Sequence, residues 1–178
     1  MRKILLSLAL VLSFAYAQAQ TEKGDWMVGG GFQLNTSDDN TQIALTPNAG
    51  LFVINNLAVG GNLVFDYSKD GNNKITEFGI GPFVRYYFTK ANVRPILHAN
   101  LNFTSLRIKA PSFSNTENGL NYFLAGGAAI FISDQVSIDG LMGYAHSKYG
   151  SSGNGGFALI IGFQVYLLKR QMDKVRGR

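Results

Sequence analysis

The stretch Phe78–Phe88, FGIGPFVRYYF, decides the fold because its side chains alternate strictly in character. Every even-numbered position is apolar, whereas the odd-numbered positions carry glycine, aromatic rings and Arg85. Successive side chains of a β-strand point to opposite faces, so this alternation predicts a strand with one apolar and one mixed face. A strand of this length exceeds the usual ~5–6 residues of soluble proteins and matches the ~9–11 residues that a tilted strand needs to cross a bilayer.

The same alternation recurs in seven other segments of the chain. Their apolar rows begin at Trp26, Ile43, Leu57, Val93, Leu120, Val136 and Phe157. In the segment that begins at Leu120 the opposite face is also apolar, so its facing stays open. Together the segments predict one all-β domain over residues 20–168, an eight-stranded antiparallel up-and-down transmembrane β-barrel.

The connections between these segments alternate in length. Short turns are expected at 55–56, 89–92 and 133–135, and longer polar loops at 36–41, 68–74, 107–118 and 147–155. In an up-and-down barrel all the short turns then lie at one end, which is typical of membrane barrels with periplasmic turns and extracellular loops. A soluble sandwich or lipocalin-like barrel, with its apolar face inward, is the alternative.

The two ends of the chain differ in character from this domain. Residues 1–19 have a cationic start, a short apolar run and small residues at Ala17 and Ala19, which together indicate a secretory signal peptide. Residues 169–178 form a basic tail. The formal net charge of +5 comes from these ends, since residues 20–168 hold 9 basic and 10 acidic residues. A nucleic-acid partner is therefore not expected.

The chain contains no cysteine and two histidines. These counts exclude disulfides, thiol catalysis and cysteine-ligated zinc, and they leave no histidine-rich metal site. We therefore expect no cofactor and no metal.

Aromatic residues gather near the ends of the predicted strands, where interfacial girdles lie in membrane proteins. Seven residues are assigned to these girdles: Trp26, Tyr67, Tyr86, Phe88, Tyr122, Tyr144 and Tyr166.

The mixed faces of the strands line a lumen that eight strands leave just wide enough for side chains to fill. Charges there must be paired or hydrated. We therefore expect an internal ion-pair network that plugs the barrel and includes Arg85 and Asp139. Its predicted members are Asp66, Glu77, Arg85, Arg94, His98 and Asp139.

Three stretches of the sequence are similar to a known family: PNAGLFVI at 47–54, NNLAVGG at 55–61 and GIGPFVRYYF at 79–88. They resemble the small eight-stranded outer-membrane barrels of the OmpA/OmpX type, and more narrowly the outer-membrane barrel family common in Bacteroidetes. The likeness covers the mature chain through Leu168. It implies a monomer in the bacterial outer membrane, in contact with lipid and lipopolysaccharide and inserted by the barrel-insertion machinery. The terminal aromatic residue that members use as insertion signal is missing here, so the signal would be internal.

A structural or adhesive role in the cell envelope is the function that we expect. The loop 107–118, with Lys109, Phe113 and Glu117, is the candidate surface for an extracellular partner. A small-solute or ion channel is the first alternative, and a lipid A-modifying hydrolase is the second. Only His146 and Ser147 could serve such a hydrolase, and adjacent strand residues point to opposite faces. We therefore expect no enzyme.

Overall fold

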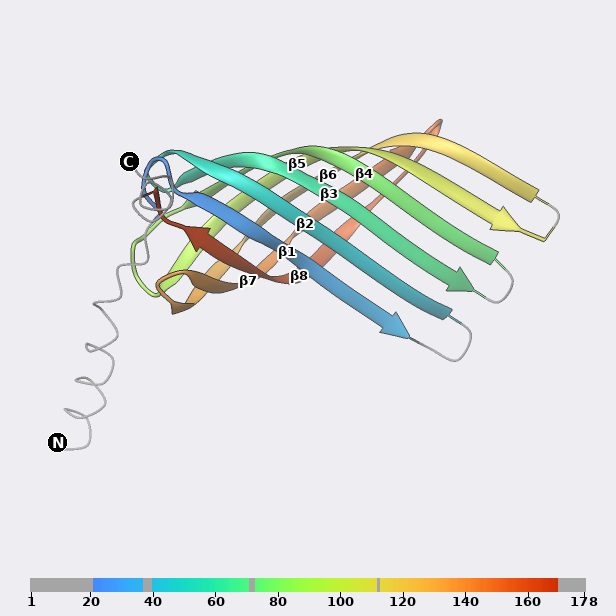
Figure 1. Cartoon of the computed structure of the whole chain (residues 1–178). Helices are drawn as coiled ribbons and strands as arrows, with labels where there is room; N and C mark the ends of the chain where they lie inside the picture. Colours follow the sequence, from blue (N-terminus) through green and yellow to red (C-terminus); the bar gives the residue numbers. More distant parts are fainter. Residues whose placement is uncertain (1–20, 37–39, 71–72, 112, 170–178) are drawn as a thin grey trace, which may run out of the picture.

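The computed structural model describes residues 21–36, 40–70, 73–111 and 113–169. In these residues, eight antiparallel strands form a closed barrel in which each strand pairs with the next and β8 returns to β1 (Figure 1). The strands are β1 Trp26–Thr36, β2 Asn40–Ile54, β3 Leu57–Asp70, β4 Asn73–Tyr87, β5 Val93–Ala110, β6 Phe113–Ser133, β7 Val136–Tyr149 and β8 Ser152–Leu167. The predicted eight-stranded up-and-down barrel is confirmed.

Two predicted segments fall largely outside this description. The signal peptide at 1–19 and the basic tail beyond Lys169 lie outside the described residues. Among the residues that are described, no helix is long and apolar enough to cross a membrane.

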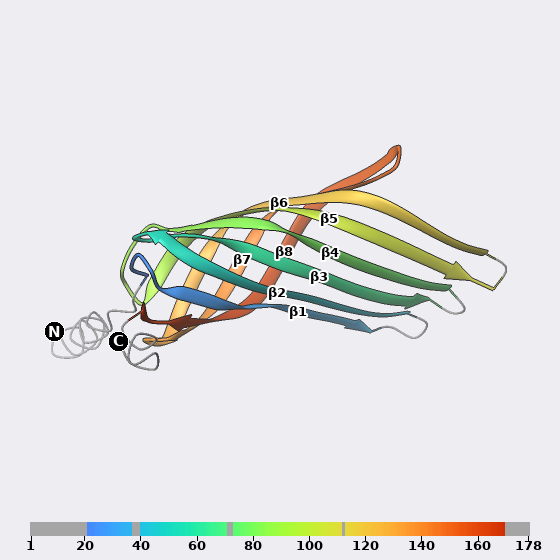
Figure 2. The same cartoon turned by 45° about the horizontal axis from the view of Figure 1, so that its top comes forward.

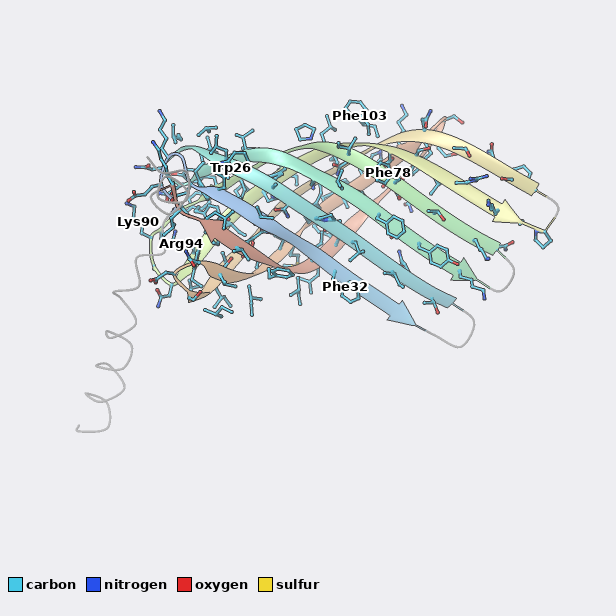
Figure 3. The ribbon with its side chains drawn as sticks, in the orientation of Figure 1. Trp26, Phe32, Phe78, Lys90, Arg94 and Phe103 are labelled. Carbon is cyan, nitrogen blue, oxygen red and sulfur yellow. The ribbon has the colours of Figure 1, made fainter. Side chains whose placement is uncertain are left out.

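The facing of the strands follows the alternation in the sequence. In β4, Ile80 and Val84 are exposed on the outside of the wall, whereas Phe83 and Arg85 are each 3% exposed in the interior. Figure 3 shows Phe32 and Phe103 standing on the outer surface. The soluble alternative, in which the apolar rows point inward, is therefore wrong.

The sixth strand, left open by its sequence, follows the same rule. Leu124 and Ile130 lie exposed on the outside of β6, while Phe123 and Phe131 are buried inside the barrel. The apolar inner face is accommodated because these two rings pack against His98 and Tyr166 in the lumen.

One end of the barrel, called here the turn end, holds the three short connections between β2 and β3, β4 and β5, and β6 and β7. Asn56 in the first of them has a φ of 67°, in the left-handed region that asparagine enters more easily than most residues. The opposite end, called here the hairpin end, differs from the prediction.

The predicted long loops are mostly strand. β5 and β6 run for 18 and 21 residues and stay paired from Val93↔Ile130 to Ala110↔Phe113, so the expected loop 107–118 is a hairpin. Strands likewise continue into the expected loops at 36–41, 68–74 and 147–155. The error has a simple cause: polar residues signal contact with water, but they do not prevent an antiparallel ladder from continuing. In Figure 1 the β5–β6 hairpin reaches furthest from the turn end.

The seam between β1 and β8 is short. It runs from Trp26↔Leu167 to Gly31↔Gly162, and beyond these positions the described register pairs β1 with β2 and β8 with β7. Figure 2 shows the β7–β8 hairpin rising away from the rest of the wall. A Cβ on Gly29 would overlap the Phe163 carbonyl oxygen and Gln164 Oε1, so glycine is required where the barrel closes.

Candidate functional site

An ion pair crosses the lumen in the half nearer the turn end. Arg85 Nη1 from β4 lies 2.6 Å from Asp139 Oδ2 of β7, and both side chains are 3% exposed. Ser137 Oγ donates a hydrogen bond of 2.6 Å to the other carboxylate oxygen of Asp139. A buried charge is tolerated when it is paired and hydrogen-bonded. The pair therefore joins opposite walls of the barrel.

Two tyrosines lie beneath this pair and help to close the turn end. The hydroxyl groups of Tyr87 and Tyr166 are 3.0 Å apart, and the Tyr166 hydroxyl is 3.1 Å from Ser137 Oγ. Phe52 packs against both rings. The assignment of Tyr166 to an interfacial girdle is wrong, because this residue has no exposed surface and belongs to the inward row of β8. Its place near the strand end suggested an interface, but the alternation decides its facing.

Arg94 seals the same end next to the β4–β5 turn. Its guanidinium donates to the carbonyl oxygens of Lys90 and Ala91 and to Thr21 Oγ1. The guanidinium carbon also lies 4.2 Å from the centre of the Phe131 ring, a cation–π geometry. Figure 3 shows Lys90 and Arg94 together at this end.

A ladder of amides continues from the ion pair toward the hairpin end. Arg85 Nε donates to His98 Nδ1 at 3.3 Å, and His98 Nε2 contacts Asn100 Nδ2. Asn102 then donates to Asn100, and Asn62 donates to Asn102 at 2.8 Å. These three asparagines are not among the residues predicted for the lumen network, although all of them lie in inward rows of their strands. The alternation of side chains along each strand already places these asparagines on the face that points into the lumen.

Asp66 and Glu77 lie nearer the hairpin end and are held by other groups. Gln42 Nε2 donates to Asp66 Oδ2 at 2.8 Å, and Asn121 Nδ2 donates to Glu77 Oε1 at 2.6 Å. The six residues predicted as one network therefore divide among three levels of the lumen. Arg85, His98 and Asp139 meet in the middle, Arg94 lies at the turn end, and the two other carboxylates lie above. Amides at the same level of the lumen bond these carboxylates, Gln42 from the neighbouring strand and Asn121 from β6, two strands away, so no long reach to Arg85 is needed.

Little free space remains in the middle of the lumen. A cavity of about 60 Å³ lies beside the ion pair and is lined by Asn48, Asn62, His98 and Gln164 among others. A water molecule occupies ~30 Å³ in the liquid, so this space suits a few waters at most. The lumen is filled by its own side chains.

A comparison with protein families agrees with this architecture. The sequence profile of the outer membrane protein beta-barrel domain matches residues 5–166. The chain belongs to this outer-membrane barrel family. Its place is thus the bacterial outer membrane, where the short turns of such barrels face the periplasm and the longer connections face outward.

Solved structures share the fold of this outer-membrane barrel. Neisserial surface protein A matches with a TM-score of 0.57 and 18% identity, covering 79% of this chain and 94% of the other. The N-terminal β-barrel domain of Pseudomonas aeruginosa OprF matches with a TM-score of 0.59 and 9% identity, covering 82% and 98%. No curated protein matches the sequence significantly.

The remaining predicted girdle residues of the outer-membrane barrel point outward in two groups. Trp26, Tyr86 and Phe88 lie near the periplasmic turns, and the Tyr86 and Phe88 rings meet edge to face with centroids 5.0 Å apart. Tyr122 and Tyr144 lie toward the hairpin end, and Tyr67 is half-buried in a surface groove there.

His146, considered for a hydrolase, stacks on the Tyr122 ring at 5.2 Å on the outside of the barrel. Ser147 faces the lumen instead. It is paired with Asn121 of β6, and Asn121 Nδ2 donates hydrogen bonds to Glu77 Oε1 and to the Tyr149 hydroxyl inside the lumen. Among the residues described, no group of three or more acidic or histidine side chains is placed to hold a metal ion.

The three residues predicted for external contact lie on the β5–β6 hairpin. Lys109, Phe113 and Glu117 are all exposed, and Asn115 Nδ2 donates to Glu117 Oε1 at 3.0 Å. They therefore project from a paired β-ribbon and not from an irregular loop.

Proposed function

We propose that this outer-membrane barrel is a non-conducting envelope protein that presents its β5–β6 hairpin to a partner outside the cell. The observation that supports the non-conducting role is the Arg85–Asp139 ion pair, which spans the lumen at 2.6 Å with both side chains buried. The tyrosines and Arg94 close the periplasmic end below it. Three successive layers of side chains thus oppose the passage of ions.

The role of the β5–β6 hairpin in binding a partner is supported by its structure. β5 and β6 remain paired to their tips, so the ribbon can hold a fixed contact surface beyond the membrane. Phe113 is 58% exposed near the tip of this ribbon. Aromatic residues, phenylalanine among them, are enriched where proteins bind one another, so this ring is the group best placed to anchor a partner.

A channel is the main alternative, and planar-bilayer recording separates the two. We expect the purified protein to show no discrete conductance steps under conditions in which an open porin does. A variant that removes the ion pair and the tyrosine floor, Arg85→Ser with Tyr87→Ser and Tyr166→Ser, should conduct if it folds. Regular conductance steps of the unaltered protein would overturn the non-conducting role.

Adhesion of cells that display the barrel tests the hairpin. Phe113→Ala with Glu117→Ala should reduce adhesion at an unchanged surface level, whereas Ser151→Ala at the tip of the β7–β8 connection should not. Equal adhesion of all three forms would contradict a contact role for β5–β6.

The hydrolase alternative has its own test. The candidate pair His146 and Ser147 lies on opposite faces of β7, a geometry that prevents one from activating the other. We expect lipid A to keep its mass after incubation with the protein, as measured by mass spectrometry. Loss of an acyl chain would contradict the proposal.

A further inference from the structure

Three lysines lie directly opposite one another on adjacent strands at the hairpin end. Lys69 of β3 pairs with Lys74 of β4, and Lys74 pairs with Lys109 of β5. Arg107 stands two residues from Lys109 and therefore on the same face, opposite Thr76 and Thr116. These four residues are called here the basic row.

Such a row is unfavourable by itself, because like charges directly opposite each other destabilise a sheet. In the described part of the chain, none of the four side chains forms an ion pair, and all four are exposed. The neighbouring carboxylates of Asp66 and Glu77 are held by Gln42 and Asn121 in the lumen. Glu117, which pairs with Leu106, lies on the face of the ribbon opposite to Arg107 and Thr116. Among the side chains that the structure describes, the row therefore has no carboxylate paired with it.

The position of the row indicates where a counter-charge comes from. Lys69, Lys74 and Arg107 continue the outward rows that contain Tyr67, Phe78 and Phe103. Phe78 and Phe103 are exposed on the lipid-facing wall (Figure 3). Lys74 and Arg107 each stand four residues beyond these rings, which is ~14 Å along the strand axis. With a strand tilt of ~45°, the basic row lies ~10 Å above the rings, in the polar region outside the hydrocarbon core.

A groove joins the basic and the aromatic side chains. Its volume is about 640 Å³, and its lining includes Tyr67, Lys74, Thr76, Phe78, Arg107 and Lys109. Hydroxyl and cationic groups are the usual partners of phosphate oxygens. The aromatic ring at the membrane side offers an apolar surface to an acyl chain.

We propose that this groove binds the phosphorylated head group of a glycolipid of the outer leaflet. The phosphate lies between Lys74, Arg107 and Lys109, and an acyl chain runs down the wall past Phe78. A lipid fits better than a soluble anion or an acidic protein because the groove continues into the lipid-facing wall. This binding does not depend on the adhesive or non-conducting role proposed above.

Native mass spectrometry of the purified full-length protein tests this with two probes, bisphosphorylated lipid A and the same lipid with its phosphates removed. The variant Lys74→Gln, Arg107→Gln, Lys109→Gln removes three charges from the groove. The matched control, Lys23→Gln, Lys90→Gln, Lys148→Gln, removes three charges from exposed sites elsewhere. Each basic residue near an anionic surface contributes roughly fivefold, so the groove variant should bind the phosphorylated lipid on the order of 100-fold more weakly.

The control should stay within about twofold of the unaltered protein, as expected for surface charges distant from the ligand. The dephosphorylated lipid should bind all three proteins equally weakly. Equal loss in the groove variant and the control, or equal binding of both lipids to the unaltered protein, would overturn the proposal.

A second measurement guards against misfolding. Lys74→Gln relieves repulsion from two lysines, so in neutral phosphatidylcholine its unfolding temperature should be higher than that of the unaltered protein. When phosphorylated lipid A is added, the unfolding temperature of Lys74→Gln should be lower than that of the unaltered protein, because one contact to the phosphate is lost. A lower unfolding temperature in both membranes would contradict the proposed repulsion and overturn the assignment.

Discussion

Arg85 Nη1 and Asp139 Oδ2 lie 2.6 Å apart across the lumen, although 54 residues separate them in the sequence. The two strands that carry them are not neighbours in the barrel, so the bond ties one wall to the other. In the function proposed above, this bridge is what opposes ion flow through the lumen.

Removal of one partner of this pair should destabilise the barrel strongly. Arg85→Ala leaves the Asp139 carboxylate buried without its cation, a change that typically costs about 3–5 kcal/mol. The double variant Arg85→Ala with Asp139→Ala should cost less than the sum of the two single variants, since neither charge is then stranded. Urea-induced unfolding in lipid vesicles measures both. An unfolding free energy that is unchanged in Arg85→Ala would argue against the bridge.

The inward position of Tyr166 makes a prediction that separates it from the outer tyrosines. Tyr166→Phe removes a hydroxyl that bonds Tyr87 and Ser137, and should cost about 1–2 kcal/mol of unfolding free energy. Tyr86→Phe on the outer wall serves as control and should change stability by less than about 0.5 kcal/mol. An equal loss of unfolding free energy in Tyr166→Phe and Tyr86→Phe would indicate that Tyr166 faces the membrane interface.

The closing seam should be intolerant of side chains at Gly29. Gly29→Val drives its Cβ into the backbone of β8, so we expect a reduced yield of the compact, heat-modifiable form on gels after refolding. Gly140→Val is the matched control, because a Cβ at Gly140 meets no atom within 4 Å. The same refolding yield for both variants would show that the seam is looser than the structure indicates.

The extended hairpin predicts slow hydrogen exchange where the sequence suggested a loop. Leu106 pairs with Glu117 and Ile108 pairs with Asn115, so segments 105–110 and 113–117 should retain substantial amide protection. Gly150, in the turn between β7 and β8, should exchange much faster. Exchange of segments 105–110 and 113–117 at the rate of Gly150 would show that they form an irregular loop and not a paired ribbon.

Much of this fold follows from alternation alone. The apolar rows in segments such as 78–88 predict the number of strands and, except in the segment that begins at Leu120, the side that each strand turns to lipid. The same parity places Arg85 and Asp139 inside. Their meeting was expected because both lie a few residues from short turns at one end of the barrel.

Other features depend on information that local sequence does not hold. The position of Asp66 and Glu77 toward the hairpin end follows from their distance to the short turns, but their hydrogen-bond partners depend on the register of the barrel. Asn121, which bonds Glu77, lies two strands away on β6. The basic row shows the same limit: the opposition of Lys69 and Lys74 follows from one hairpin, but Lys109 joins them only through the β4–β5 register. The extension of β5 and β6 beyond the membrane was not predicted, because paired strands in water need no apolar row and their polar residues resemble those of a loop.

The facing of the wall is the claim on which all the others depend, and a nitroxide scan along β4 tests it most directly. The chain has no cysteine, so single cysteines at Ile80, Phe83, Val84 and Tyr86 take one label each. In lipid vesicles we expect high oxygen accessibility at the even positions 80, 84 and 86, and low accessibility at 83 inside the lumen. High oxygen accessibility at position 83 with low accessibility at 80, 84 and 86 would contradict this facing. Equal access of a water-soluble relaxing agent to all four positions would contradict it too.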